Sequence, residues 1–189
     1  KILEIGDSSP TELQKLGELA KFRRILADAK SDEALPHIVE MIKNGGAPVI
    51  VFSAHVSAVD KFKKIGGFEV ITGASSQKHR DDCVNRFQDG KLDGLAMTIG
   101  AGGTGLTLTA SCRMIFIDLD WSPSINAQAE DRICRIGQKN ACDYFHIVSS
   151  DWVDQLVWRS ITRKNKMIDN IGPYETRDGP IYILPRQGQ

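Results

Sequence analysis

The feature that most constrains the fold is an alternation of strand-like and helix-like runs after Gly45-Gly46. Short runs rich in Val, Ile, Leu and Phe are separated by longer runs with helical periodicity. Several strand-like runs are apolar on successive residues, as expected when both faces of a sheet are covered. The pattern predicts an α/β fold with a mostly parallel sheet and helices on both faces. The predicted strands are 48–52, 68–72, 93–99, 113–118 and 143–148, and the predicted helices are 55–65, 76–88, 123–136 and 151–169.

The two ends of the chain differ from this middle part. Helical periodicity with mixed charge predicts helices over 11–30 and 32–44, and prolines and glycines from Gly172 onward predict a loop or a short strand pair on the surface. We expect a piece of a longer protein, because the first residue is Lys rather than Met. The predicted units are a helical lead-in (1–44), a core (45–150), a C-terminal helix (151–170) and a tail (171–189).

Composition excludes few partners. The chain has 24 basic and 24 acidic residues, so binding to nucleic acid must depend on local patches. No apolar run approaches the length of a membrane span and no signal peptide opens the sequence, so we expect an intracellular protein without a membrane partner. Its cysteines, at 83, 112, 134 and 142, contain no Cys-x-x-Cys pair, so we predict reduced thiols and no metal site.

A polar stripe is predicted near residue 130. Gln128, Arg132 and Arg135 would lie on one side of a helix that starts at Ser122-Pro123. An apolar stripe would lie beside them, formed by Ile125, Ala129, Ile133 and Ile136. Two guanidinium groups with the same orientation favour a phosphate ligand. The alternative is a surface helix in which Asp131 and Arg135 form a weak ion pair.

The glycine-rich segment 100–107 has three interpretations. Gly100, Gly102 and Gly105 satisfy the dinucleotide-binding pattern G-x-G-x-x-G, and Asp118 and Asp120 lie downstream. Too few residues follow for the usual crossover helix, however. The segment also nearly matches a phosphate-binding loop, but a leucine occupies the lysine position. A structural turn that allows close packing of strand and helix is the third possibility.

Three segments, 102–109, 118–123 and 128–138, together resemble the second RecA-like lobe of Swi/Snf-type ATPases, in superfamily 2 of the helicases. Upstream, the run 49–53 is similar to helicase motif IV, and the run 71–88 is similar to the block that follows it. The resemblance spans about residues 11–170, and Leu19-Ala-Lys21 is similar to the annealing-helicase branch. It implies a RecA-like, P-loop NTPase-like fold that lacks its own Walker A motif.

The resemblance implies roles at an ATP site between two lobes. Arg132 and Arg135 would be arginine fingers that stabilise charge on the γ-phosphate, and Gln128 would hydrogen-bond nearby. The loop containing Gly103, Thr104 and Gly105 would couple the state of the bound nucleotide to the DNA. Cys134 occupies a position that is usually His in the family.

The parts that hold the nucleotide are missing. No Gly-Lys-Thr/Ser loop occurs, and no Asp-Glu-x-x box follows a predicted strand. ATP and Mg²⁺ would therefore be held mainly by a first lobe, which we expect N-terminal to Lys1, and we predict that this chain alone is inactive. The whole protein would translocate on duplex DNA without sequence preference, in the nucleus if eukaryotic or in the cytoplasm or nucleoid if bacterial or viral.

The resemblance also implies contacts with DNA phosphates through hydroxyl and backbone N–H groups. An equally simple interpretation of each Ser or Thr is a local turn or cap. A run of cations between Arg159 and Lys166 adds either a phosphate-facing edge or a solvated helix face. The candidate DNA contacts are Ser53, Thr72, Gly73, Thr98, Thr107, Arg163 and Lys164.

Other residues are assigned ordinary roles. We predict that His55 and His79 lie on the surface or in loops, that Trp121 packs against the neighbouring lobe, and that Trp152 and Trp158 serve the core. Two other functions stay open: a non-enzymatic binding module for nucleic acid or protein on the same fold, and a dinucleotide-binding oxidoreductase.

Overall fold

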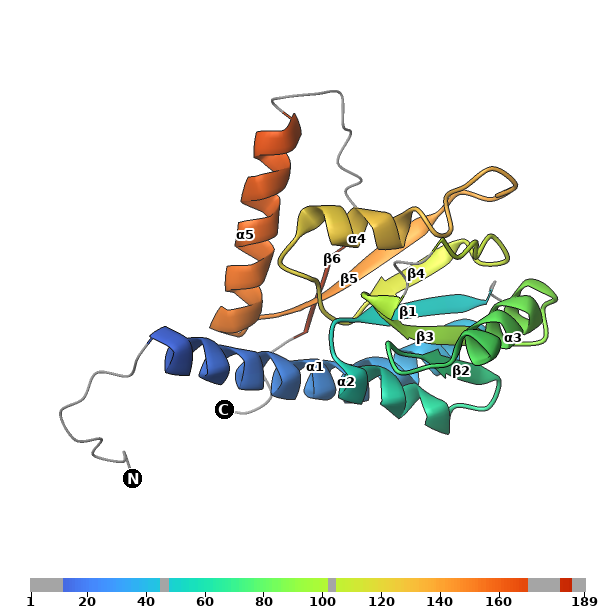
Figure 1. Ribbon diagram of the computed structural model, residues 1–189, viewed down its shortest axis with the longest axis horizontal. Coiled ribbons are helices and arrows are strands. Elements are labelled where there is room, and N and C mark those ends of the chain that lie inside the picture. Colours follow the sequence, from blue (N-terminus) through green and yellow to red (C-terminus); the bar gives the residue numbers. More distant parts are fainter. Residues whose placement is uncertain (1–11, 45–47, 102–104, 170–180, 185–189) are drawn as a thin grey trace.

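The computed structural model describes residues 12–44, 48–101, 105–169 and 181–184, which form one parallel sheet flanked by helices (Figure 1). The strand order is β2-β3-β1-β4-β5-β6, and every pair of neighbours is parallel. The predicted α/β fold is therefore confirmed. The strands are β1 (Val49–Ser53), β2 (Phe68–Ile71), β3 (Gly94–Thr98), β4 (Arg113–Phe116), β5 (Asp143–Ser149) and β6 (Ile181–Leu184). The helices are α1 (Glu12–Lys43), α2 (Val56–Asp60), the 3₁₀ turn η1 (Lys61–Lys64), α3 (Gln77–Gln88), α4 (Pro123–Glu130) and α5 (Trp152–Asp169).

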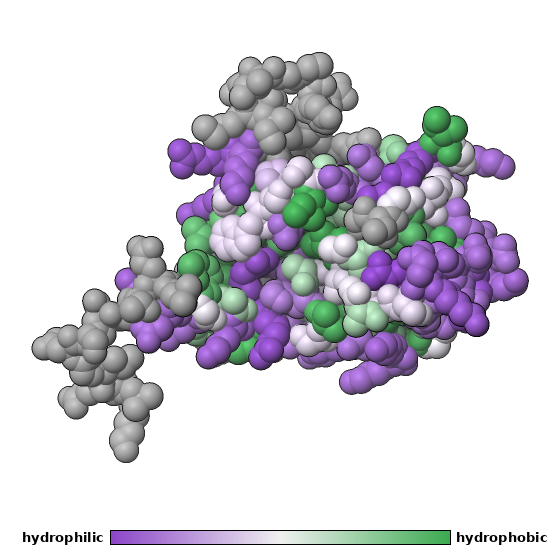
Figure 2. All heavy atoms as spheres, viewed as in Figure 1, coloured by the Kyte–Doolittle hydropathy of each residue, from purple (hydrophilic) through white to green (hydrophobic). Residues whose placement is uncertain are grey.

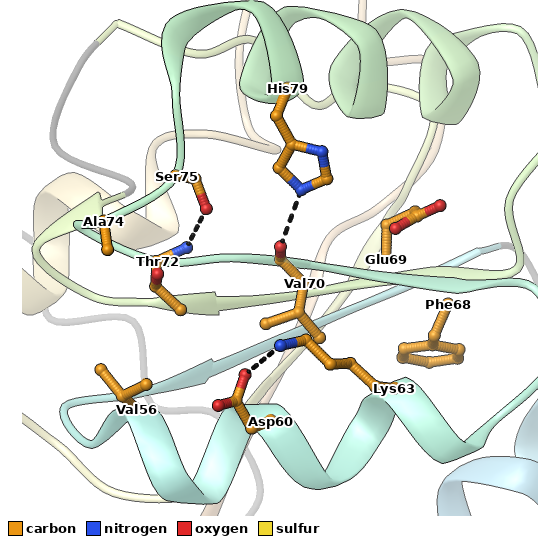
Figure 3. A pocket seen from close by; sticks show the side chains of 10 residues that line it. All are labelled: Val56, Asp60, Lys63, Phe68, Glu69, Val70, Thr72, Ala74, Ser75 and His79. Carbon is orange, nitrogen blue, oxygen red and sulfur yellow. Dashed lines mark hydrogen bonds and ion pairs between the residues drawn. The ribbon is translucent and has the colours of Figure 1, made fainter.

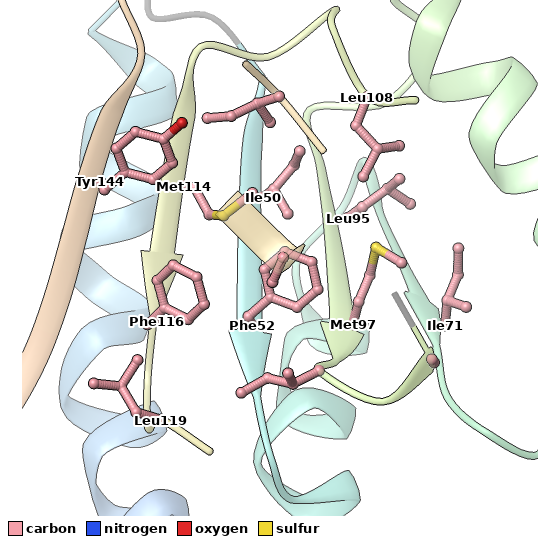
Figure 4. Close-up of a cluster of buried hydrophobic side chains, with 14 of the residues drawn as sticks. Ile50, Phe52, Ile71, Leu95, Met97, Leu108, Met114, Phe116, Leu119 and Tyr144 are labelled. Carbon is pink, nitrogen blue, oxygen red and sulfur yellow. The ribbon is translucent and has the colours of Figure 1, made fainter. Parts of the chain in front are cut away.

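The sheet carries a core on each face because side chains alternate along its strands. In β1, Ile50 and Phe52 belong to one cluster, and Val49 and Val51 to the other. The first cluster includes residues of α3, α4 and α5, and Figure 4 shows its strand residues packed side by side. The second cluster includes residues of α1, α2 and η1. The outer surface over α3 is hydrophilic (Figure 2), as expected for a helix that buries only one side.

The N-terminal helix differs from the prediction. The periodicity suggested two helices separated near residue 31, but α1 is one helix of 32 residues that contains Pro36. Lys30 and Ser31, at the expected break, are buried. Tertiary packing therefore keeps this stretch helical where the sequence pattern alone suggested an interruption.

The C-terminal tail contributes a strand to the sheet. Residues 181–184 were expected to form a loop or a surface strand pair, but β6 pairs in parallel with β5, with Ile147 opposite Tyr182. It is therefore an edge strand of the main sheet rather than half of a separate hairpin. Among the residues that the structure describes, no helix is long and apolar enough to cross a membrane.

His146 of β5 predicts a pH dependence of stability. Its ring stacks on Phe116, with centroids 5.1 Å apart, and burial lowers its pKa to about 4. The unfolded chain takes up a proton near pH 6.5, whereas the folded protein does so only near pH 4, so stability falls as pH decreases across this window. Between pH 7.5 and pH 5 we expect a loss of about 2 kcal/mol from this residue.

Urea unfolding at the two pH values measures that loss. His146→Phe keeps an aromatic ring and removes the titrating group, so its stability should fall by about 2 kcal/mol less than that of the wild type over the same interval. Parallel pH profiles for the two proteins would contradict the prediction.

Candidate functional site

Several candidate residues lie where parallel strands end, because all strands of the sheet run in one direction. Ser53 ends β1, Thr98 ends β3, and Thr72 follows β2. Ser53 and Thr98 are buried, however, whereas Gly73 is exposed and Thr72 half-buried. The predicted contacts between DNA and the Ser53 and Thr98 side chains therefore lack an accessible hydroxyl group in this structure.

The Ser53 hydroxyl has a hydrogen-bond partner within the chain. It donates a hydrogen bond to Oδ1 of Asp118, which also accepts the backbone N–H of Ala54 at 3.0 Å. Arg23 Nη2 lies 3.6 Å from the other carboxylate oxygen, Oδ2. His55 Nε2 also lies 3.6 Å from Oδ2, and burial lowers the pKa of this His while Asp118 opposes the shift. Asp118 thus joins β1, α1 and the end of β4, and its carboxylate is not available to a ribose.

Arg23 also fixes the segment after β4. Nη2 donates to Leu119 O at 2.5 Å, and the guanidinium lies 5.1 Å from the centre of the Trp121 ring. Lys164 Nζ donates to Trp121 O at 2.8 Å. Trp121 therefore packs within its own chain, against α1 and α5. Of the other two tryptophans, Trp158 packs against the core but Trp152 is 64% exposed, so its predicted core role is wrong.

The predicted polar helix stripe is wrong. Ser122 and Pro123 begin α4 as expected, but the helix ends at Glu130. Bonds from Arg132 N to Ala129 O, at 3.1 Å, and from Ile133 N to Glu130 O, at 3.3 Å, span three residues and tighten the chain into turns. Gln128 is exposed on the last turn of α4, whereas both arginines lie beyond it. Of the apolar stripe, Ala129 and Ile133 are buried, but Ile125 and Ile136 are exposed.

Residues 131–138, which we call the arginine turn, pack against the segment that follows the glycine loop. Arg135 Nη1 lies 3.3 Å from Thr107 Oγ1 and 3.5 Å from Gly105 O. Its Nε donates to the backbone oxygen of Asp131 at 3.0 Å. Gly137 has a φ of +105°, a conformation that favours glycine. The structure therefore brings together two motifs that are about 30 residues apart in sequence.

Arg132 lies on the inner side of the same turn. It is 5% exposed, and its backbone oxygen accepts Leu108 N at 3.0 Å. Burial lowers the pKa of its guanidinium, and the positive charge of Arg135 lowers it further, while Asp131 opposes both. The two arginines are close enough to repel each other, so an anion beside them would be attracted. Gly103 and Thr104 lie outside the described residues.

The glycine segment does not lead into a crossover helix. Residues 105–112 of the connection from β3 to β4 contain no helix. A dinucleotide fold needs one at that position, so the oxidoreductase interpretation is wrong.

Comparison with known proteins identifies the family. Residues 31–137, more than half of the 189-residue chain, match the family described as helicase conserved C-terminal domain. The chain belongs to this family. Its relatives include the SWI/SNF-related matrix-associated actin-dependent regulator of chromatin subfamily A-like protein 1 of Xenopus laevis, 29% identical over 89% of this chain and 18% of the relative. They also include the DNA annealing helicase and endonuclease ZRANB3 of Homo sapiens, 29% identical over 87% of this chain and 16% of the relative.

A solved structure supports the same fold. This helicase C-terminal domain matches the C-terminal part of the Fun30 ATPase domain with a TM-score of 0.64 and 19% identity, over 75% of this chain and 52% of that one. The resemblance to the second RecA-like lobe of Swi/Snf-type superfamily 2 helicases is thus confirmed. The chain spans less than a fifth of the length of the two curated relatives.

One Asp-Glu-x-x sequence does occur in this helicase C-terminal domain, at Asp32-Glu33. It lies inside α1 rather than after a strand, and the Asp32 carboxylate pairs with Lys61. It does not have the position of an Mg²⁺ box beside a nucleotide.

Gln138 is a structural residue that sequence analysis did not single out. Its Nε2 lies 2.6 Å from Ser111 O, 3.2 Å from Ile133 O and 3.3 Å from Thr109 O. Its Oε1 accepts the backbone N–H groups of residues 139 and 140. The side chain therefore fastens the arginine turn of the helicase C-terminal domain to the segment before β4. The signal in the sequence that could have found it is its place at the end of the 128–138 motif.

Replacing Gln138 by Ala should loosen the arginine turn. The change leaves several backbone groups without their partner, so we expect the free energy of unfolding to fall by about 1–3 kcal/mol. Gln128→Ala, an exposed site on α4, is the matched control and should change it by less than about 0.5 kcal/mol. Urea unfolding of the chain measures both, and equal losses would count against the assigned role of Gln138.

Proposed function

We propose that this chain is the second lobe of an ATP-dependent translocase on double-stranded DNA, and that it supplies Arg132 and Arg135 to the ATP site. The observation that carries the proposal is the contact of Arg135 with Gly105 and Thr107, beside the buried Arg132. Phosphoryl transfer needs positive charge where negative charge accumulates on the γ-phosphate. Two neighbouring guanidinium groups on an exposed turn meet that requirement.

The two arginines differ in how far they are exposed to a neighbouring lobe. Arg135 is exposed and can reach a phosphate on a neighbouring lobe, whereas Arg132 is mostly buried beside it and would add its positive charge from the inner side of the turn. Gly103, Thr104, Gly105 and Gln128 would complete this side of the nucleotide site. ATP and Mg²⁺ would be held mainly by the first lobe, which is the necessary partner, so the chain alone would be inactive.

Names of the relatives support DNA as the second partner. One is a DNA annealing helicase, and another is the DNA repair and recombination protein RAD54-like of Drosophila erecta. On this chain, the accessible candidates for phosphate contact are Gly73, Thr107 and Arg163, which are exposed, and the half-buried Thr72. Lys164 is exposed but also donates to Trp121 O. We therefore retain these five residues and leave out the Ser53 and Thr98 side chains. A nuclear location would follow for a eukaryotic source.

The loop with Thr72 and Gly73 is held in a defined shape. Arg80 Nη2 lies 3.1 Å from both Thr72 O and Gly73 O, and its Nε donates to Ser75 O at 3.0 Å. The Thr72 N–H itself donates to Ser75 Oγ at 3.0 Å, so the groups of this loop that we propose for phosphate contact are the Thr72 hydroxyl and the Gly73 backbone N–H.

ATP hydrolysis with and without duplex DNA tests the proposal. The protein used must contain this chain together with its first lobe, and the decisive variant is Arg135→Ala. Hydrolysis that depends on DNA and on Arg135 supports the proposal. The alternative, a non-enzymatic binding module, predicts a parent protein without a Walker A lysine and with no ATP hydrolysis.

A further inference from the structure

Three side chains with metal-binding atoms meet between β2 and α3. Glu69 belongs to β2, and His79 and Cys83 belong to α3. Their ligand atoms all lie within 4.8 Å of one another. Glu69 and His79 also line a pocket of about 610 Å³ beside β2, and Figure 3 shows both side chains on the side of the strand that faces α3. Cys83 is fully buried, so the cluster has a protein side and a solvent side.

His79 and Cys83 lie side by side on α3, and a small rotation of the imidazole ring would turn the Nδ1 lone pair towards the sulfur. They are four positions apart on α3, which places both on the same side of the helix. Cys83 Sγ lies 3.7 Å from Nδ1 of His79 and 3.5 Å from Nε2. In a tetrahedral zinc site with Zn–N of about 2.0 Å and Zn–S of about 2.3 Å, the nitrogen and the sulfur are roughly 3.6 Å apart.

Neighbouring groups orient two of the three ligands. His79 Nε2 lies 3.2 Å from Val70 O, so a proton on Nε2 leaves the Nδ1 lone pair for a metal. Arg86 Nη1 lies 2.7 Å from Glu69 Oε1 and leaves Oε2 outside this contact. Histidine and carboxylate ligands of metals are commonly held by such outer hydrogen bonds.

We propose that Glu69, His79 and Cys83 bind one Zn²⁺ ion, with water from the pocket as the fourth ligand. A set of one sulfur, one nitrogen and one oxygen ligand favours zinc over magnesium or calcium, which prefer oxygen. Binding would displace the thiol proton to solvent. The ion would join β2 to α3 across the loop that contains Thr72 and Gly73. This site does not depend on the proposed ATPase function, and it replaces the prediction that the chain has no metal ligands.

Cobalt titration of the metal-free, untagged chain tests the site. We expect one Co²⁺ per chain, with absorption from thiolate-to-cobalt charge transfer that disappears when Zn²⁺ is added. His79→Ala and Cys83→Ser should remove the charge-transfer absorption and weaken Zn²⁺ binding by about 100-fold or more. Glu69→Gln should weaken it by about tenfold and keep the absorption.

Two control variants test whether metal binding depends on the proposed ligands rather than on other thiol or imidazole groups. Cys142→Ser and His37→Ala remove a thiol and an imidazole elsewhere and should bind like the wild type. Because Cys83 is in the core, His79→Ala at an exposed position is the decisive variant, with folding checked by circular dichroism. The proposal is overturned if excess Co²⁺ gives no charge-transfer absorption, or if His79→Ala binds Zn²⁺ as the wild type does.

Discussion

Replacing Arg135 by Ala in the two-lobe protein should lower kcat for DNA-stimulated ATP hydrolysis by about 10³- to 10⁵-fold. An arginine finger acts on the charge that develops during phosphoryl transfer, so kcat falls far more than the affinity for ATP. Arg135 is the better target of the two arginines because it is exposed. Arg132 is 5% exposed, and its removal would also weaken the fold.

The Arg135 experiment has two controls. Lys139→Ala removes one positive charge from an exposed position just after the arginine turn and should keep hydrolysis within a few-fold of wild type. Arg135→Lys keeps the charge but loses the planar two-pronged donor, so it should restore little of the rate. Wild-type hydrolysis by Arg135→Ala would refute the assignment of this residue as an arginine finger.

The sheet could be predicted from sequence because its signal is local. Each strand is a short apolar run, and the helices between them keep an apolar side. Predicted and observed strands differ by at most two residues at either end, as 93–99 against Gly94–Thr98 shows. The exception is β6, whose residues come from a segment rich in proline and glycine and gain order from pairing with β5.

The arginine turn could not be predicted from helical periodicity. The sequence from Pro123 to Ile136 fits a helix, but the chain leaves it after Glu130. Distant contacts decide this: Gln138 bonds to Ser111 O, and Arg132 O accepts Leu108 N. The resemblance to the helicase family selected the same two arginines without predicting their geometry. Family motifs preserve residue identity, whereas the local conformation depends on tertiary hydrogen bonds.

Buried polar contacts could not be predicted from the sequence either. Nothing in the pattern distinguishes Lys30 from the other basic residues of α1, yet it is 2% exposed. Its Nζ lies 3.0 and 2.9 Å from the two Asp154 carboxylate oxygens and donates to Ile147 O at 3.0 Å. Pairing with a residue more than 100 positions away is visible only in the fold.

We therefore expect Lys30→Met to lower the free energy of unfolding by about 3–5 kcal/mol. The variant leaves the Asp154 carboxylate partly buried without its cation, although Oδ2 still accepts Ser149 N at 2.6 Å. Because this one ammonium group connects α1 to β5 and α5, its loss should weaken the attachment of α1 to the sheet. Urea unfolding of the chain measures the change.

Two further variants test whether burial of the Lys30–Asp154 pair causes the expected loss of stability. Adding Asp154→Asn to Lys30→Met removes the unpaired charge and keeps an oxygen for Ser149 N, so the double variant should recover part of the lost stability. Lys63→Ala breaks a surface pair, with Nζ 2.7 Å from Asp60 Oδ1 and both side chains exposed, and should cost less than about 1 kcal/mol. If Lys30→Met lost no more stability than Lys63→Ala, the buried pair would not be what holds α1 against the sheet.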